Sequence, residues 1–322
     1  MPQESAYFRR FVVLQRYSMT APAATLLICT HNRAELLRRC LASVRAQLPG
    51  HDWVRRVIVV DNASTDHTAA VVAAFNQQDV RFERLVEPQL GLSHARNRGA
   101  AVADTPWLAY LDDDARLRPG YLNIAHQLLP SDAAAFGGMY YAWFPFGKVD
   151  WLPAGFGTKV SLGETPRTLH EPYLSGGNLW LRRTAWQAVG GFDATLGMRG
   201  GRMGYAEEDR LQRRLLDLGY VLHWQPDLAI DHAVLPHKLR LGWHLRDGYA
   251  KGRDGIRHAR TPLPVALGRL VGSATVGMVR RSCAGAYRLL TRTDYHWENL
   301  LLDVLRPVYA HTGRVVGRLQ RS

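Results

Sequence analysis

The feature that most constrains the fold is a regular alternation of short apolar runs and amphipathic segments from residue 24 onward. Apolar runs bounded by polar residues predict buried strands, and leucines at helical spacing predict helices between them. The expected strands are 25–29, 57–60, 80–86, 106–111 and 133–141, and the expected helices are 34–47, 64–77, 95–102 and 119–129. This alternation predicts an α/β fold with a mostly parallel sheet flanked by helices on both faces.

Polar clusters follow three of these predicted strands. They are Thr30-His31-Asn32, Asp61-Asn62 and Asp112-Asp113-Asp114, and Asn32 is also a fair N-cap for the following helix. Ligands of parallel sheets bind at the carboxyl ends of the strands. We therefore expect the three clusters to meet along one edge of the sheet and to form a binding site there.

The triplet of aspartates predicts a metal site. Carboxylates this close repel each other and raise each other's pKa unless a cation lies between them. Carboxylate oxygens suit a hard divalent ion, so Mg²⁺ or Mn²⁺ is the expected cofactor. A solvated acidic turn after a strand is the alternative. His232, in Ile230-Asp231-His232, is a further candidate ligand, or else a histidine satisfied by ordinary hydrogen bonds.

Two later segments are also candidates for function. Residues 142–172 are rich in Trp, Phe, Gly and Pro, which is typical of either a packed surface loop or a substrate-specificity loop. Glycines at 176 and 177 indicate a close approach of the backbone to another group. The acidic run 207–209 opens an amphipathic helix, where acidic side chains complement the helix dipole.

The net charge of +13 is concentrated at the C-terminus. Residues 233–322 hold 16 Lys/Arg against 5 Asp/Glu, whereas residues 1–232 hold 25 against 23. The basic segment reads as helical, and it is either a subdomain with a solvated basic face or a surface that rests on anionic lipid. No apolar stretch reaches the roughly 18 residues of a spanning helix.

The order of the motifs resembles that of the family 2 glycosyltransferases. It runs Thr-His-Asn-Arg (30–33), Val-Asp-Asn-Ala-Ser-Thr-Asp (60–66), Ala-Arg-Asn (95–97), Leu-Asp-Asp-Asp (111–114), Gly-Gly-Asn (176–178), Gly-Gly-Phe-Asp (190–193) and Glu-Glu-Asp (207–209). The resemblance covers roughly residues 24–232. It implies the GT-A (Rossmann-like) fold and inverting transfer of a sugar from a nucleotide-diphospho-sugar to an acceptor hydroxyl.

The resemblance also implies roles for individual residues. Asp114 would bind the metal, with Asp112 contacting the metal or the ribose and His232 as a further ligand. Asp209 would be the general base, and the run of three acids leaves Glu208 as a second candidate. The implied donor-binding residues are Thr30, Asn32, Asp61, Arg96, Asp112, Asp113, Gly177 and Asn178.

The resemblance suggests a UDP-sugar as donor and a glycan or lipid-linked acceptor. The Gln-x-x-Arg-Trp motif of processive members is absent, which favours transfer of a single sugar, in polysaccharide or other glycoconjugate synthesis. We expect a cytoplasmic protein, peripheral on the inner face of the membrane. The expected division is an arm over 1–22 (with Met19 as an alternative start), a glycosyltransferase domain over 23–232 and a basic helical region over 233–322.

Two other classes compete with this interpretation. A nucleotidyltransferase uses a similar sheet, but it would typically carry a glycine-rich basic loop where this chain has Thr-His-Asn-Arg. A nucleic-acid-binding protein would suit the basic charge, yet base-stacking aromatics or a recognition helix are missing from the basic segment. Neither G-x-G-x-x-G after a strand nor a P-loop motif occurs, so dinucleotide-binding and P-loop functions lose their main support.

Overall fold

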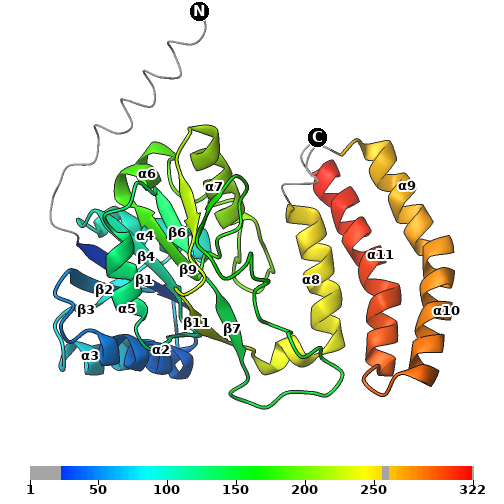
Figure 1. The fold of residues 1–322 in the computed structure, drawn as a ribbon, viewed down its shortest axis with the longest axis horizontal. Coiled ribbons are helices and arrows are strands. Elements are labelled where there is room, and N and C mark those ends of the chain that lie inside the picture. Colours follow the sequence, from blue (N-terminus) through cyan, green and yellow to red (C-terminus); the bar gives the residue numbers. More distant parts are fainter. Residues whose placement is uncertain (1–22, 256–260, 321–322) are drawn as a thin grey trace, which may run out of the picture.

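The computed structural model describes residues 23–255 and 261–320, so the predicted arm over 1–22 lies outside the described residues. A central eight-stranded sheet forms the body of the protein (Figure 1). Its strands run in the order β3 (Phe82–Val86), β2 (Val54–Asp61), β1 (Ala24–Thr30), β4 (Trp107–Asp112), β9 (Asn178–Arg182), β6 (Ala135–Gly137), β10 (Leu222–Trp224) and β8 (Arg167–Leu169).

The sheet is mostly parallel, as the sequence predicts. Strands β3, β2, β1 and β4 all pair in parallel, which brings the ends of β1, β2 and β4 to one edge. Strand β9 is antiparallel to both β4 and β6, and β8 is antiparallel to β10. The pairings of β9 and β8 depend on contacts between distant parts of the chain, so no local sequence pattern predicts them.

Helices cover both faces of the sheet. Leu26 and Ile28 of β1 join one core cluster and Leu27 joins the other, because successive side chains of a strand point to opposite faces. The first face carries α2 (Ala34–Gln47), α3 (Thr68–Asn76) and α5 (Tyr121–Leu128). The second carries α4 (Leu92–Val102), α6 (Arg183–Ala188) and α7 (Glu207–Asp217). The predicted α/β fold is confirmed.

The prediction that Asn32 caps the N-terminus of α2 is wrong. Asn32 has a positive φ of 51°, and its side-chain oxygen accepts the backbone N–H of Thr65 at 2.7 Å. The first amide of the helix, that of Ala34, donates instead to the Asp66 carboxylate at 3.0 Å. The loops after β1 and β2 therefore hold each other in place, which steadies the edge where the polar clusters meet.

The prediction of a single strand over 133–141 is also wrong. The chain divides at Gly138 into β6, which belongs to the main sheet, and β7 (Tyr140–Trp143), which belongs to a second sheet. The strand order of this second sheet is β5 (Ala115–Leu117), β11 (Ile230–Ala233), β7. A Cβ at Gly138 would lie 2.2 Å from the Gln225 carbonyl oxygen. Only glycine fits where the chain passes between the two sheets.

The basic C-terminal segment is helical, as predicted. It comprises the short 3₁₀ helix η1 (Pro236–Leu239) and the helices α8 (Leu241–Asp254), α9 (Leu263–Ala274), α10 (Val276–Thr291) and α11 (Trp297–Leu319). These helices stand beside the sheet domain, with α11 next to α8 and α10 on the outer side (Figure 1). Among the described residues, no helix is long and apolar enough to span a bilayer.

Candidate active site

A cavity of about 750 Å³ lies at the carboxyl ends of the central strands. Its floor comes from the ends of β1 and β4 and from β11, and its far wall comes from α8 and α11 of the C-terminal region. The aromatic stretch 142–172, for which a packed surface loop and a substrate-specificity loop were the alternatives, contributes Trp151 and Phe156. The predicted meeting of strand ends is therefore observed for Thr30, Asn62 and Asp112–Asp114, and the C-terminal helices complete the enclosure.

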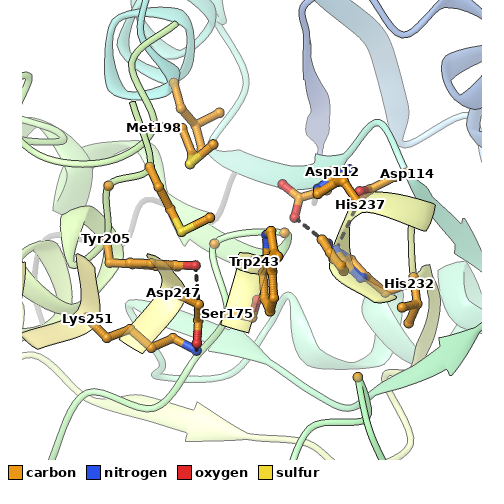
Figure 2. Close-up of a pocket in the computed structure, with 18 of the residues that line it drawn as sticks. Asp112, Asp114, Ser175, Met198, Tyr205, His232, His237, Trp243, Asp247 and Lys251 are labelled. Atoms are coloured by element: carbon orange, nitrogen blue, oxygen red, sulfur yellow. Dashed lines mark hydrogen bonds and ion pairs between the residues drawn. The ribbon is translucent and has the colours of Figure 1, made fainter. Parts of the chain in front are cut away.

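The polar centre of the cavity is formed by Asp112, Asp114 and His232 (Figure 2). The His232 Nε2 atom lies 3.2 Å from the Asp114 Oδ1 atom and 3.7 Å from the Asp112 Oδ2 atom. Pairing of β5 with β11 sets this geometry, since His232 stands opposite Ala115 in the ladder. One ligand atom from each residue fits within a span of 4.8 Å.

The electrostatics of this cluster suit a cation. The neighbouring carboxylates raise the pKa of His232 to about 9 against the opposing effect of burial. Although burial opposes it, contact with His232 holds the pKa of both Asp112 and Asp114 below the usual range. Two carboxylate oxygens and one imidazole nitrogen form a donor set that fits Mn²⁺ or another divalent ion in place of the imidazolium proton.

The third aspartate of the triplet points to another partner set. Asp113 accepts a hydrogen bond from the Thr30 hydroxyl at 2.7 Å and pairs with Arg33 at 3.0 Å. Its side chain is not part of the metal-type cluster. Burial raises the pKa of Asp113 to about 6, with Arg33 acting in the opposite direction. Asp113, the middle aspartate of the triplet, therefore links the end of β4 to the loop that follows β1.

Arg96 connects the acidic cluster to the start of α7. It is almost fully buried, and its guanidinium lies 2.9 Å from the Glu207 carboxylate and 3.5 Å from that of Asp112. Gly177 faces the same carboxylate, and a Cβ there would lie 2.0 Å from the Asp112 Oδ2 atom. This explains the glycine that the sequence analysis placed at a close backbone approach.

The three acids at the start of α7 have different environments. Glu207 and Glu208 both line the cavity, whereas Asp209 is exposed and is not among the residues that line it. The Oε2 atoms of Glu207 and Glu208 are buried and have no hydrogen-bond partner among the described residues. Arg96 holds the other carboxylate oxygen of Glu207 at 2.9 Å, so the cavity carboxylate without an arginine partner among the described residues is Glu208, one residue before the predicted base Asp209.

Three of the predicted donor-binding residues do not line the cavity. The Asp61 carboxylate is held by Arg84 at 2.6 Å and by the Ser64 amide. Asn32 is occupied by Thr65. Asn178 is fully buried, where it accepts the Tyr121 hydroxyl at 2.6 Å and donates to two backbone carbonyls. The side chains of Asp61, Asn32 and Asn178 thus bind other residues of the protein, and these contacts stabilise the strands and loops around the site.

The sequence analysis missed the wall opposite the acidic cluster. Trp243 stands between this cluster and a polar group formed by Tyr205, Asp247 and Lys251 (Figure 2). The Tyr205 hydroxyl donates to the buried Asp247 carboxylate at 2.7 Å, and Lys251 pairs with it at 2.9 Å. The only local signal in the sequence is Trp243, an aromatic residue within the basic C-terminal segment.

Comparison with known proteins identifies the family. The model of "Glycosyl transferase family 2" matches residues 25–190, which is over half of the chain. The chain belongs to glycosyltransferase family 2. The resemblance inferred from the order of the motifs is thereby confirmed.

Individual members of glycosyltransferase family 2 match parts of the chain. Validoxylamine A glucosyltransferase of Streptomyces hygroscopicus is 33% identical over 128 residues, which is 38% of this chain and 30% of the relative. Glucosyl-dolichyl phosphate glucuronosyltransferase of Haloferax volcanii is 24% identical over 68% of this chain and 72% of its own length. The chain therefore spans under a third of the first of these relatives.

A solved structure supports the fold over nearly the whole chain. The mannosyltransferase PcManGT from Pyrobaculum calidifontis, in complex with GDP-Man and Mn²⁺, has a TM-score of 0.58 at 18% identity. The match covers 94% of this chain and 92% of that one. The shared fold is the GT-A type predicted above, with a helical C-terminal part.

Proposed function

We propose that this protein is an inverting, metal-dependent glycosyltransferase that moves a single sugar from a nucleotide-diphospho-sugar to an acceptor hydroxyl. The observation that carries the proposal is the Asp112, Asp114 and His232 cluster, whose ligand atoms lie within 4.8 Å at the strand ends of a family 2 fold. Family membership supports sugar transfer, and the donor set supports the choice of Mn²⁺ or Mg²⁺ as cofactor.

Each group around the cluster has a proposed task. Asp112, Asp114 and His232 would hold the divalent ion, which when bound neutralises charge on the departing nucleoside diphosphate. Arg96 fixes the Asp112 carboxylate through its ion pair. Asp113, held by Thr30 and Arg33, fixes the end of β4 against the loop that would face the nucleotide. Asp61, Asn32 and Asn178 would support the loops of the donor site without touching the sugar.

Glu208 is the proposed general base. It lines the cavity, and one of its oxygens is without a hydrogen-bond partner among the described residues, so this oxygen is available to take a proton. The acceptor hydroxyl loses its proton as it attacks the anomeric carbon, and a carboxylate that is not bound to the metal is suited to remove it. Glu207 also lines the cavity with one oxygen that lacks a partner among the described residues, but Arg96 engages its other oxygen at 2.9 Å, so we propose Glu208 as the base.

The donor, the acceptor and the position of the protein in the cell follow from the same function. We propose UDP as the donor nucleotide, a glycan or lipid-linked acceptor, and a peripheral position of the basic region 233–322 on an anionic membrane surface. The domain division after residue 232 belongs to the same proposal. The excess of positive charge in that region supports the membrane contact.

The direct test is hydrolysis of sugar nucleotides by the full-length protein. A panel of UDP-, GDP- and dTDP-sugars is incubated with Mn²⁺, with Mg²⁺ and with EDTA, and the release of nucleoside diphosphate is measured. We expect slow release from one nucleotide class, only with metal. Unchanged release in EDTA contradicts the metal dependence, and absence of release from every donor, together with absence of donor binding by calorimetry, contradicts the function.

A further inference from the structure

A second cavity, of about 570 Å³, lies between α10 and α11 on the outer side of the C-terminal helices. Four arginines line it: Arg280, Arg281, Arg288 and Arg306. The only acidic lining residue in the described part of the chain is Asp303. We call this cavity the arginine cleft. Its lining carries a formal excess of three positive charges.

Internal partners only partly neutralise these arginines. Arg288 pairs with Asp303 at 2.8 Å, and Arg306 pairs with Asp247 at 3.0 Å. Arg281 donates to the Ser273 carbonyl oxygen, but its buried Nε atom has no partner among the described residues. Arg280 has no acidic partner within the same residues. Repulsion among these guanidinium groups favours an anion that is bound between them.

The shape of arginine donors indicates which anion fits. The planar guanidinium presents parallel N–H groups that match the oxygens of phosphate, and arginine is preferred where such groups are recognised. Several arginines around one cleft suit a phosphate monoester or a diphosphate better than a single carboxylate. The chemistry of the cleft therefore points to a phosphate group.

An exposed apolar face runs beside the cleft. Val276, Val279, Tyr287 and Leu290 of α10 are 66–88% exposed. At about 100° per residue they fall within about 80° of one another on the helix surface. On the neighbouring helix α9, Leu267 and Val271 are also exposed and lie about 40° apart on the helix surface. An apolar face bordered by arginines is the arrangement of helices that lie in the interface of a bilayer.

The arginine cleft also adjoins the proposed active site. Leu302, Asp303 and Arg306 of α11 line both the cleft and the main cavity. A lipid whose phosphate occupies the cleft would lie one helix away from Trp243 and the acidic cluster.

We propose that the arginine cleft binds the phosphate or diphosphate of a membrane lipid. The apolar face of α9 and α10 then lies in the bilayer interface. The acceptor of this protein is a saccharide or hydroxyl that such a lipid phosphate carries. The acceptor part rests on the proposed glycosyltransferase function. Lipid binding itself needs neither donor nor metal, so an experiment can contradict the lipid site without contradicting the glycosyltransferase function, and the reverse.

The test uses cosedimentation of the full-length protein with vesicles. Phosphatidylcholine vesicles that contain phosphatidic acid are compared with vesicles of equal charge that contain oleate, and with phosphatidylcholine alone. We expect tight binding to the phosphatidic acid vesicles and much weaker binding to the other two. Equal binding to the oleate vesicles overturns the phosphate site and leaves only diffuse charge attraction.

The matched variants are Arg280→Gln/Arg281→Gln in the cleft and Arg55→Gln/Arg98→Gln on the sheet domain, where both arginines are exposed. The cleft variant should bind phosphatidic acid vesicles roughly thirtyfold more weakly, from the attraction of each basic residue at an anionic surface. The control variant, which loses the same charge, should bind as wild type. An equal loss in both variants overturns the proposal.

Two further measurements separate the alternatives. A neutral variant of the apolar face, Val279→Asn/Leu290→Asn, should also lose vesicle binding although it keeps every arginine. Unchanged binding of this variant overturns the bilayer contact.

Calorimetry with inorganic pyrophosphate tests whether the cleft binds a soluble ligand. Binding of pyrophosphate as tight as the binding to vesicles overturns the lipid assignment. All variants should keep the metal-dependent donor hydrolysis of wild type. The thermal melt of each is compared as well, because Arg281→Gln also removes the hydrogen bonds that Arg281 donates to Ser273. Loss of that hydrolysis in wild type, with vesicle binding intact, refutes only the glycosyltransferase function.

Discussion

The Nε2 atom of His232 lies 3.2 Å from the Oδ1 atom of Asp114, although the two residues are far apart in the chain. The antiparallel pairing of β11 with β5 creates this contact by placing His232 beside Ala115, the residue that follows Asp114. A small second sheet thus adds an imidazole to the carboxylates that end the main sheet.

The first prediction concerns metal binding. Asp114→Asn removes one charged ligand and leaves His232 with a single carboxylate neighbour, so we expect binding of Mn²⁺ and of donor to be lost together. Calorimetry with Mn²⁺ and then with donor measures both. Asp104→Asn, an exposed aspartate outside the cavity, is the matched control and should bind both normally. Normal Mn²⁺ affinity in Asp114→Asn would remove this residue from the metal site.

The second prediction concerns the general base. Glu208→Gln should lower kcat by about 10²–10⁴-fold, which is typical of the loss of general-base catalysis. Donor affinity should be retained, because the metal cluster is intact. Asp209→Asn should keep most of its turnover, since Asp209 does not line the cavity. Steady-state kinetics that show the opposite ranking would restore Asp209, the residue that the sequence favoured.

The third prediction concerns Gly177. A Cβ at this position would lie 2.0 Å from the Asp112 Oδ2 atom, so Gly177→Ala must displace that carboxylate. We expect weaker Mn²⁺ binding and a folded protein. Gly155→Ala is the control, because nothing lies within 4 Å of its Cβ position. If both variants bind Mn²⁺ equally well, the close packing of Gly177 against Asp112 is not required for the site.

The fourth prediction concerns Asn178, which resembles a sugar-side residue in sequence but is fully buried. Asn178→Ala removes the acceptor of the Tyr121 hydroxyl proton and the donor to the Met139 and Leu228 carbonyls, although Tyr121 still accepts from Trp180 and Met139 still accepts from the Ile230 amide. It should destabilise the fold by about 1–3 kcal/mol for each buried group that is left unsatisfied. Chemical denaturation measures the loss. Asn123→Ala, at an exposed position of α5, should cost little. A stable variant with a raised KM for donor would instead place Asn178 at the sugar.

Much of the sheet domain could be predicted from the sequence because its signals are local. The apolar runs of β1, β2 and β4 and the helical spacing in α2 are periodic patterns, and each is set by burial of near neighbours along the chain. The meeting of Thr30 with the aspartates follows from parallel pairing alone. The predicted strand over 133–141 failed because Gly138 passes between two sheets, and that depends on the carbonyls of Gln225 and Leu228.

Only the tertiary structure decided which side chains share the cavity. The sequence alone determined that carboxylates end a buried strand, that a second acidic run opens a later helix, and that positive charge gathers at the C-terminus. It did not determine that Glu208 faces the cavity while Asp209 faces solvent, because the rotation of α7 is fixed by Leu211 and Leu215 packing on the sheet and by the Arg96–Glu207 ion pair. Likewise α11 lines both the cavity and the arginine cleft only because it packs against α8 on one side and α10 on the other. Such contacts join residues that are distant in sequence, and no local pattern encodes them.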